Sequence, residues 1–291
     1  MKKIYKPNKL SSPLHINYNG FLYLEEEKVF SVNNRAFKYG DALFESIRVI
    51  NGKPCYLEDH FIRLKKGMTV LKMRSANISF NDLKNQIEKL IEKNHIRRGG
   101  RVRLTVFRSG DGLYTPEDEG KSYVIEARPY MDNDYVLNEN GLNIDVYNDL
   151  KRPRNILSQI KTTNNIPHVL TGIYKKENDL DDCIVLNDQG RIVEAISSNI
   201  FLYKNNNLYT PSLDEGCMDG IMRKQVLRIA KEMNINVFEG MLNGSMLLQA
   251  DEMFLTNAIK GIQWVVSYRQ KRYFSKATKE VLSHLNQSVP V

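Results

Sequence analysis

Short strand-like segments alternate irregularly with amphipathic helix-like segments along this chain, and the alternation constrains its fold more than any other feature. The runs 102–108 and 123–129 are rich in residues typical of strands, whereas 58–72 carries apolar residues at helical spacing. A regular strand–helix–strand repeat would indicate one doubly wound parallel sheet. The irregular order instead predicts an α/β fold of the α+β kind, with mixed sheets in two domains.

A polar segment without periodicity, 131–137, marks the expected domain boundary. The 291 residues are enough for two domains of roughly 150 residues, each able to bury a core. We expect a smaller N-terminal α/β domain over 1–130 and a larger C-terminal domain over 138–291. A cleft between two such domains is the usual place for a ligand.

Local signals predict the main elements of both halves. In the first half these are strands over 21–24 and 45–51, a return strand over 55–57 after an Asn51-Gly52 turn, and helices over 58–72 and from the cap Asn81 onward. In the second half they are a strand over 143–147, a helix over 162–176 with Pro167 in its first turn, hairpins joining 184–186 to 192–194 and 199–203 to 208–210, and a helix opened by Gly220.

Composition argues against several classes of protein. No apolar run approaches the ~18 residues of a membrane span, and the N-terminal residues lack the apolar stretch of a signal peptide. Cys55, Cys183 and Cys217 are far apart and odd in number, which predicts neither a disulfide framework nor a thiolate zinc site. We therefore expect a cytoplasmic protein without a membrane contact or a metal centre.

The chain is basic, with 42 Lys and Arg residues against 34 Asp and Glu residues and a formal net charge of +8. Such an excess is found in proteins that bind nucleic acid. Here it is diffuse, and its densest patches, 97–103 and 151–154, are not interleaved with the aromatic residues on which single strands stack. We expect both patches to be solvated surface and predict no nucleic-acid partner.

A charged residue occupies the apolar stripe of the predicted helix 58–72. Arg63, Leu64 and Gly67 follow His60 by three, four and seven residues, so all four share one helix face. A buried guanidinium needs a partner, because an unpaired buried charge is strongly destabilising. The partner is either a carboxylate of the protein or, in the functional interpretation, a phosphate gripped by two hydrogen bonds.

The helix predicted to follow Gly220 is a second candidate anion site. A helix start led by glycine presents free backbone N–H groups and the positive end of the helix dipole, which together suit a phosphate. Every helix has such an end, so the run 219–223 alone is equally typical of a purely structural helix start.

Several segments, taken in order and spacing, resemble one enzyme family. The similarity is to the fold-type-IV (class IV) pyridoxal phosphate enzymes, which include branched-chain aminotransferases, D-amino-acid aminotransferases and 4-amino-4-deoxychorismate lyases. It covers nearly the whole chain and implies a two-domain homodimer that binds pyridoxal 5'-phosphate and a small-molecule amino substrate. The segments that carry it are 34–48, 60–64, 161–165, 193–201, 209–214 with 220–223, and 250–257.

The resemblance implies a role for individual residues. Lys161 matches the lysine that holds the cofactor aldehyde and, once displaced by the substrate amine, moves the Cα proton. Glu194 matches the carboxylate that keeps the pyridine nitrogen protonated. The other positions expected to bind the cofactor or its phosphate, or to support those that do, are Arg63, Ser198, Asn199, Ile221, Met222, Thr256 and Asn257.

Departures from the family pattern bear on the reaction. Met222 stands where many aminotransferases have Thr or Ser, and Ile166 replaces a tyrosine of the branched-chain enzymes. Both favour the lyase branch. Glu45, by contrast, occupies a position where some lyases carry threonine.

Substrate recognition is expected to involve an arginine that grips a carboxylate. Arg103 matches the position used by branched-chain enzymes and Arg108 the position used by lyases, while Tyr39 and Phe44 are candidates to line the pocket. A structural interpretation is also open, since Arg101 and Arg103 alternate on one strand face that is either solvated or functional.

These observations predict a 4-amino-4-deoxychorismate lyase, which forms 4-aminobenzoate and pyruvate on the way to folate. The alternative is a branched-chain or D-amino-acid aminotransferase with the same cofactor. A third interpretation, a basic scaffold protein without catalysis, is disfavoured by the presence of Lys161 and Glu194.

Overall fold

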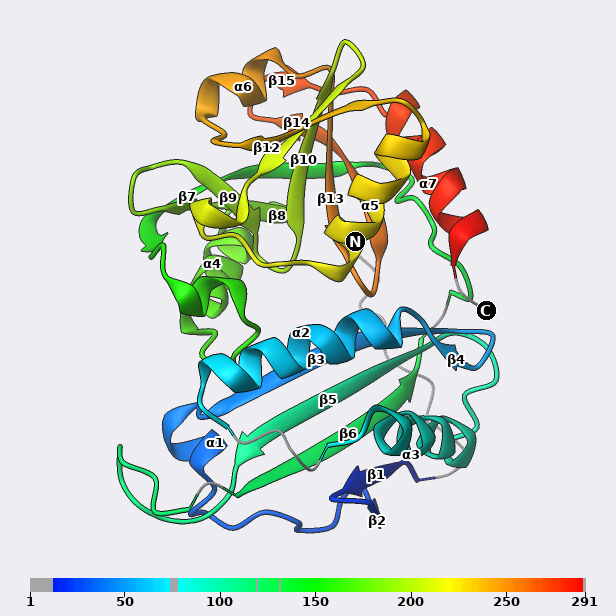
Figure 1. Ribbon diagram of the computed structural model, residues 1–291. Coiled ribbons are helices and arrows are strands. Elements are labelled where there is room, and N and C mark those ends of the chain that lie inside the picture. The colour runs from blue at the N-terminus through cyan, green and yellow to red at the C-terminus, as the bar shows by residue number, and fades with distance from the viewer. Residues whose placement is uncertain (1–12, 74–77, 119, 131, 290–291) are drawn as a thin grey trace.

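The computed structural model describes residues 13–73, 78–118, 120–130 and 132–289. They form two β-sheets with flanking helices, one above the other in Figure 1, and each sheet is built from one half of the chain. The predicted α/β fold with two sheets is confirmed. Within these described ranges, no helix is both long and apolar enough to cross a membrane.

The first sheet has the strand order β2-β1-β6-β5-β3-β4, and its neighbours pair antiparallel. Its strands are β1 (His15–Tyr18), β2 (Phe21–Leu24), β3 (Ala42–Ile50), β4 (Lys53–Pro54), β5 (Gly100–Arg108) and β6 (Lys121–Pro129). The predicted strands are confirmed apart from the return strand, which is the short β4 and not 55–57. The predicted turn is confirmed, because Asn51 and Gly52 both have the positive φ (49° and 73°) that a tight hairpin requires.

Helices α2 (Leu57–Val70) and α3 (Phe80–Lys93) pack on one face of this sheet. The short helix α1 (Arg35–Tyr39) lies near Thr105 and Phe107, which point to the other face. Alternate residues of β3 and β5, such as Ile47 and Val102, pack against α2 and α3 in one core. The cap predicted at Asn81 is wrong. Ser79 caps α3, since its Oγ accepts from the N–H of Asp82 at 3.4 Å, and Asn81 lies inside the first turn.

The second sheet mixes parallel and antiparallel pairs, in the order β12-β11-β10-β13-β14-β7-β8-β9 with β15 beside β14. Its strands are β7 (Leu142–Arg152), β8 (Asp182–Asn187), β9 (Ile192–Ala195), β10 (Asn199–Lys204), β11 (Asn207–Pro211), β12 (Asn236–Gly240), β13 (Glu252–Asn257), β14 (Gly261–Tyr268) and β15 (Lys271–Arg272). Both predicted hairpins are confirmed, as β8–β9 and β10–β11. Strand β7 extends past the predicted 143–147 to Arg152.

Helices and 3-10 turns surround the second sheet. They are η1 (Ile156–Gln159), α4 (Ile166–Glu177), η2 (Leu213–Glu215), α5 (Ile221–Glu232), α6 (Gly244–Gln249) and α7 (Lys276–Ser288). Helix α5 follows Gly220, as predicted. Helix α4 begins later than the predicted 162, because the preceding residues bind the first sheet. The Thr163 N–H donates to the Ala42 carbonyl at 3.1 Å, and its hydroxyl donates to the Gly40 carbonyl at 3.0 Å.

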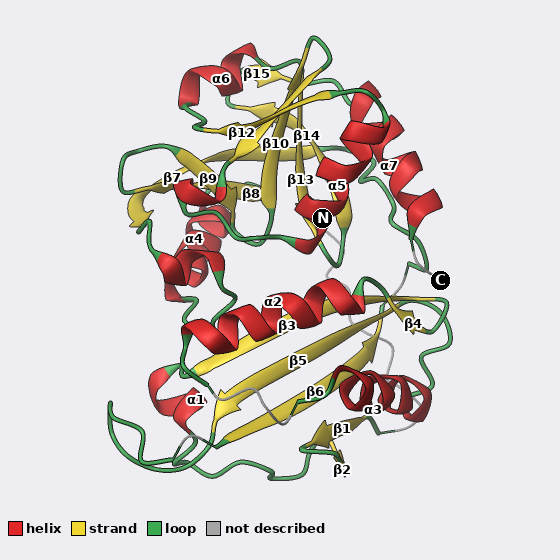
Figure 2. Cartoon of the chain, in the orientation of Figure 1, coloured by secondary structure: helices red, strands yellow, loops and turns green. Residues whose placement is uncertain are grey.

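Helix α2 lies on the side of the first sheet that faces the second half (Figure 2). Across this junction, Asp59 of α2 accepts from Lys224 Nζ at 2.5 Å and from Gln225 Nε2 at 2.9 Å on α5. Ile50 and Cys55 pack in the same core as Phe201 and Phe254 of the second sheet. The two halves therefore meet through polar and apolar contacts, and the segment 161–165 lies at this junction.

Candidate active site

Lys161 lies between η1 and α4, where the chain returns to the first sheet. The Phe44 N–H donates to the Lys161 carbonyl at 2.9 Å, and Leu43 forms an isolated bridge with Thr162. These backbone contacts fix the lysine beside β3. Its Nζ lies 4.4 Å from the centroid of the Phe44 ring.

The environment of this amine shifts its protonation. Burial, followed by the positive charge of Arg63, lowers the pKa of Lys161 from 10.5 to about 8, against the opposing effect of Glu45 and Glu194. A larger share of the amine is therefore neutral near neutral pH than for an ordinary lysine. A neutral amine is able to accept a proton or to attack a carbonyl.

Glu45 on β3 forms one buried cluster with two residues of α2. Arg63 donates through Nε to Glu45 Oε1 at 2.9 Å and through Nη2 to Oε2, and His60 Nδ1 lies 2.6 Å from Oε2. Burial acts to raise the pKa of Glu45, but the charge of Arg63 and the His60 hydrogen bond lower it to about 2. Arg63 thus has the carboxylate partner that one interpretation of the sequence required. Its Nη1 also donates to the Asp219 carbonyl at 2.8 Å, next to the start of α5.

A cradle of unused donors lies at the start of α5. Among the described residues, no side chain caps this helix, and Thr256 Oγ1 is buried without a hydrogen-bond partner. Thr256 pairs with Asn199 across β10 and β13, and Asn199 Nδ2 donates to the Met218 carbonyl at 2.8 Å. A Cβ at Gly220 would lie 1.9 Å from Asn199 Oδ1, so glycine is required for this close approach. Buried donors without acceptors suit the phosphate of a cofactor.

The neighbouring predicted residues support this cradle. Asn257 Nδ2 donates to Ser198 Oγ at 3.0 Å, and its Oδ1 accepts the N–H groups of residues 259 and 260. The side chains of Ile221 and Met222 are buried, and Met222 packs in the core that contains Phe201. At these two helix positions the backbone N–H is therefore the group that is able to meet an anion.

Glu194 on β9 is the centre of a second buried cluster. Its Oε1 accepts from Arg152 Nη1 and lies 3.3 Å from His168 Nε2, while its Oε2 accepts the Met218 N–H at 2.9 Å. Burial acts to raise the pKa of Glu194, but the charge of Arg152 and the His168 hydrogen bond hold it below its usual value. The carboxylate is therefore ionised.

Arg152 and His168 contact Glu194 although no sequence pattern singles them out. The prediction that 151–154 is solvated surface is wrong for Arg152, whose side chain is 13% exposed and paired with Glu194. No local spacing signals this contact, because Arg152 ends β7 and Glu194 lies on β9, with β8 between them. The contact depends on the strand order of the second sheet.

Arg103 lies close to the lysine. Its guanidinium carbon is 4.0 Å from the centroid of the same Phe44 ring that contacts Lys161 Nζ, and its Nε is 3.8 Å from Glu126. Burial is the main cause that lowers the pKa of Arg103. The Arg103 side chain is 32% exposed, so a ligand carboxylate has access to it.

The structure places the other two substrate candidates differently. The Tyr39 ring lies against Tyr114, with centroids 5.7 Å apart. Arg108 is buried, and its guanidinium donates to Asp41 at 2.9 Å and to the Leu71 carbonyl at 2.7 Å. These bonds tie the end of β5 to the end of α2.

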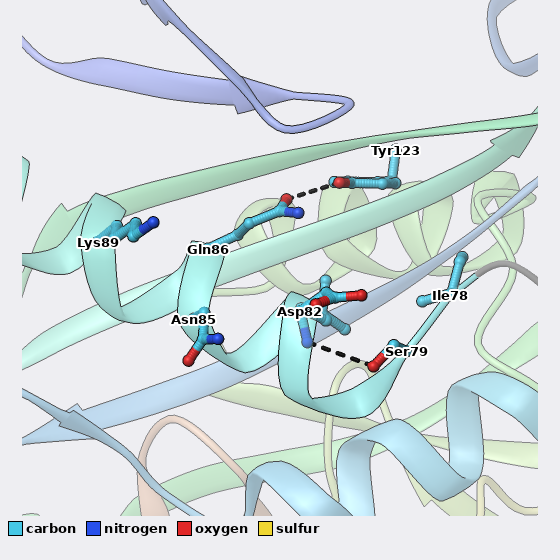
Figure 3. A pocket seen from close by; sticks show the side chains of 8 residues that line it. Ile78, Ser79, Asp82, Asn85, Gln86, Lys89 and Tyr123 are labelled. Carbon is cyan, nitrogen blue, oxygen red and sulfur yellow. Dashed lines mark hydrogen bonds between the residues drawn. The ribbon is translucent and has the colours of Figure 1, made fainter.

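A separate polar pocket of about 280 Å³ opens at the start of α3 (Figure 3). In the figure, the Tyr123 hydroxyl points toward Gln86, to which it donates at 2.6 Å. This pocket shares no residue with the clusters around Lys161. Its lining residues are Ile78, Ser79, Asp82, Leu83, Asn85, Gln86, Lys89 and Tyr123.

The site thus combines a buried amine, two ionised carboxylates and a cradle suited to phosphate, as in an enzyme for a small anionic ligand. The family described as Amino-transferase class IV matches residues 42–268. The chain belongs to this class IV aminotransferase family.

Three known proteins illustrate the range of the family. D-alanine aminotransferase from Bacillus licheniformis is 28% identical over 290 residues, 95% of this chain and 97% of that protein. Aminodeoxychorismate lyase from Bacillus subtilis (strain 168) is 26% identical over 269 residues, 90% and 89% of the two chains. The structure of the branched-chain amino acid aminotransferase from Escherichia coli has a TM-score of 0.85 at 23% identity, covering 94% and 93%.

Family membership defines the chemistry at a coarse level. The chain is an enzyme of the pyridoxal phosphate-dependent class IV family, acting as an aminotransferase or a lyase on a small molecule. The unused donors at Thr256 and at the start of α5 fit the cofactor's phosphate.

Proposed function

We propose that this enzyme is a 4-amino-4-deoxychorismate lyase, with Lys161 as its catalytic base. Lys161 Nζ and the Arg103 guanidinium both contact the Phe44 ring, which supports a proton-transfer group and a group for a substrate carboxylate in either branch of the family. The observation that carries the choice of a lyase is in the sequence. Met222 and Ile166, which depart from the aminotransferase pattern, favour elimination over amino transfer.

The cofactor is proposed to be held by residues from both halves. Arg63, Thr256 and the backbone N–H groups of Ile221 and Met222 bind its phosphate, and Glu194 accepts a hydrogen bond from its ring nitrogen. When bound, pyridoxal phosphate supplies an aldehyde for the substrate amine and a protonated ring that withdraws electrons.

The protein's own groups then carry out the reaction. Arg103 binds a carboxylate and orients the substrate, and Lys161 Nζ takes the proton from the carbon that bears the amine. Loss of this proton allows a second bond of the substrate to break, namely the bond between a ring carbon and the oxygen atom of the three-carbon side chain. The proton leaves with that fragment as pyruvate, and the aromatic product is 4-aminobenzoate. One substrate gives one molecule of each product.

The second candidate function is amino transfer from a branched-chain or D-amino acid. Glu45 favours it, because some lyases have threonine at this position, whereas here the carboxylate pairs with Arg63 and His60. The full-length similarity to a D-alanine aminotransferase also supports it. The two functions differ in one requirement, since amino transfer needs a 2-oxo acid as acceptor.

The deciding experiment mixes the cofactor-loaded enzyme with 4-amino-4-deoxychorismate in the absence of any 2-oxo acid. Equal and catalytic release of 4-aminobenzoate and pyruvate is the expected result. If neither product is released while the cofactor remains bound, the lyase proposal is wrong. Turnover of an amino donor after addition of a 2-oxo acid would then establish the aminotransferase.

We also propose that the enzyme is a homodimer, through surfaces that carry exposed apolar side chains. An apolar groove of about 410 Å³ is lined in part by Phe30, Val32, Phe37 and Phe107. Helix α4 exposes apolar residues at one-turn spacing, namely Ile166, Val169, Leu170 and Ile173. Sedimentation should give a dimeric mass at working concentration, and a monomeric mass would contradict the proposal.

A further inference from the structure

The Glu194 carboxylate is fixed by groups from three separate parts of the second half. Arg152 reaches it from the end of β7, His168 from α4, and the Met218 N–H from the segment before α5. Glu194 itself is 4% exposed. A carboxylate oxygen has about two acceptor positions, so Oε2 keeps one beyond the Met218 bond, whereas the two groups that lie near Oε1 are both side chains.

Arg152 is a fixed positive charge at this carboxylate. Its Nη2 donates to the Ser158 carbonyl while its Nη1 meets Glu194, and within the described ranges its buried Nε has no hydrogen-bond partner. A guanidinium does not lose its proton in proteins. Arg152 therefore favours the ionised form of Glu194, and the Ser158 bond holds the guanidinium beside the carboxylate.

His168 occupies a position with two incompatible hydrogen bonds. Its Nε2 lies 3.3 Å from both Arg152 Nη1 and Glu194 Oε1. The guanidinium only donates and the ionised carboxylate only accepts. Nε2 therefore accepts from Arg152 when it lacks a proton, or donates to Glu194 when it carries one. The position of the proton on His168 thus decides how strongly the Glu194 carboxylate is able to accept a hydrogen bond from another donor.

We propose that Arg152 and His168 are positioning residues that hold Glu194 ionised and oriented toward the ring nitrogen of pyridoxal phosphate. The inference rests on the proposed placement of Glu194 beside that nitrogen. Arg152 supplies the charge and the fixed position, and His168 adjusts the hydrogen-bonding strength of the carboxylate. Removing Arg152 leaves a buried carboxylate that takes up a proton or turns away, and in either case binds a protonated ring nitrogen less well.

A double-mutant cycle on cofactor affinity tests this inference. The apoenzymes of the wild type, Arg152→Met, Glu194→Gln and the double variant are titrated with pyridoxal phosphate, and the absorption spectrum of the bound cofactor is recorded. We expect Arg152→Met to weaken binding by about 10- to 100-fold. In the Glu194→Gln background the same change should have no further effect, because Arg152 acts through Glu194.

The controls separate positioning from folding. Arg154→Met is the matched control, since Arg154 is two residues from Arg152 and pairs with Asp188 instead of Glu194. This variant should leave the Kd for pyridoxal phosphate unchanged. Arg152→Lys keeps the charge and should restore part of the affinity. His168→Leu removes the Nε2 contact, and it should shift the spectrum of the bound cofactor more than His168→Gln, which keeps a donor. The double variant lacks both buried charges and remains informative if Arg152→Met alone fails to fold.

Each outcome decides the inference. An equal loss of affinity from Arg152→Met in both backgrounds would show that Arg152 acts independently of Glu194 and would overturn it. A Glu194→Gln variant with unchanged Kd and spectrum would overturn the placement of Glu194 as well. Neither result depends on lyase turnover, so failure of the proposed reaction is recognised separately by the product assay.

Discussion

Two buried carboxylates in different halves of the molecule have similar partners and different origins. Each lies within hydrogen-bond distance of one arginine and one histidine, and each acts to raise the pKa of Lys161. The groups are Glu45 with Arg63 and His60, and Glu194 with Arg152 and His168. The Glu45 partners lie three residues apart on a single helix. The Glu194 partners come from a strand end and from another helix.

Exposure also differs between the two clusters. The side chains of His60 and Arg63 are 2% and 9% exposed, whereas those of Arg152 and His168 are 13% and 23% exposed. Water therefore compensates more readily for a lost carboxylate at Glu194 than at Glu45. The difference suggests that Glu45 mainly stabilises the fold and holds Arg63, while Glu194 mainly serves the bound cofactor.

The largest expected effect comes from the amine that both clusters influence. Lys161→Ala should reduce turnover by about 10³-fold or more, because the cofactor attachment and the proton acceptor are lost together. Steady-state kinetics with each candidate substrate measures it. Lys176→Ala, an exposed lysine on α4, is the control. Full activity of Lys161→Ala would refute its assignment as the base.

Replacing each carboxylate in turn tests the comparison directly. Glu45→Ala should lower the free energy of unfolding of the apoenzyme by about 3–5 kcal/mol, since it leaves Arg63 buried and unpaired. Glu194→Ala should lower the same free energy of unfolding by only about 1–3 kcal/mol, because the partners of Glu194 are more exposed. Urea unfolding measures both values. Equal losses would remove the distinction between the clusters.

Acid stability should also depend on Glu45. Its pKa is about 2 in the fold, against 4.5 for an ordinary glutamate, so the unfolded chain binds more protons between these values. The contribution, about 3 kcal/mol, is complete above pH 4.5 and is lost as the pH falls toward 2. Glu45→Gln should lack this part of the pH dependence of unfolding. An unchanged profile in that variant would contradict the shifted pKa.

Substrate binding should distinguish the arginines near the clusters. Arg103→Leu is expected to raise the KM for a carboxylate substrate by about 10- to 100-fold, the usual effect of losing a hydrogen-bonded charge. Arg101→Leu, at an exposed position on the same face of β5, is the matched control. If Arg108→Leu instead raises KM at unchanged stability, Arg108 and not Arg103 binds the carboxylate.

The smallest effect is expected in the cradle between the clusters. Thr256→Val should weaken pyridoxal phosphate binding by about 10-fold, because one charge-assisted hydrogen bond is lost. Stability of the apoenzyme should stay equal or rise, since a buried hydroxyl without a described partner is removed. Calorimetry with and without cofactor separates the two quantities. A loss of apoenzyme stability would indicate a structural role for Thr256.

The candidate site shows how far sequence periodicity reaches. The shared helix face of His60 and Arg63 follows from the 3.6-residue repeat, so the burial of Arg63 was predictable. The start of α5 at Gly220 was predictable for the same local reason. The sequence left the partner of Arg63 open, and only the position of Glu45 on β3 shows that a protein carboxylate is one of its partners.

Local sequence patterns did not predict the contacts between distant segments of the chain. Arg152 meets Glu194 because β8 lies between β7 and β9, and strand order has no signature in local spacing. The start of the helix after Lys161 was predicted too early for a related reason, since Thr163 bonds to the backbone of β3 instead of to its own helix.

The sequence by itself determined the two-sheet fold class, the hairpins, most helices and the family. The tertiary structure decided which charges pair, how far the pKa of Lys161 falls, and that Arg108 braces a helix end while Arg103 lies beside the lysine. The physical reason is the number of residues along the chain over which each kind of interaction acts. Helix and hairpin signals act over a few residues, whereas burial and charge pairing depend on every segment that packs around a group.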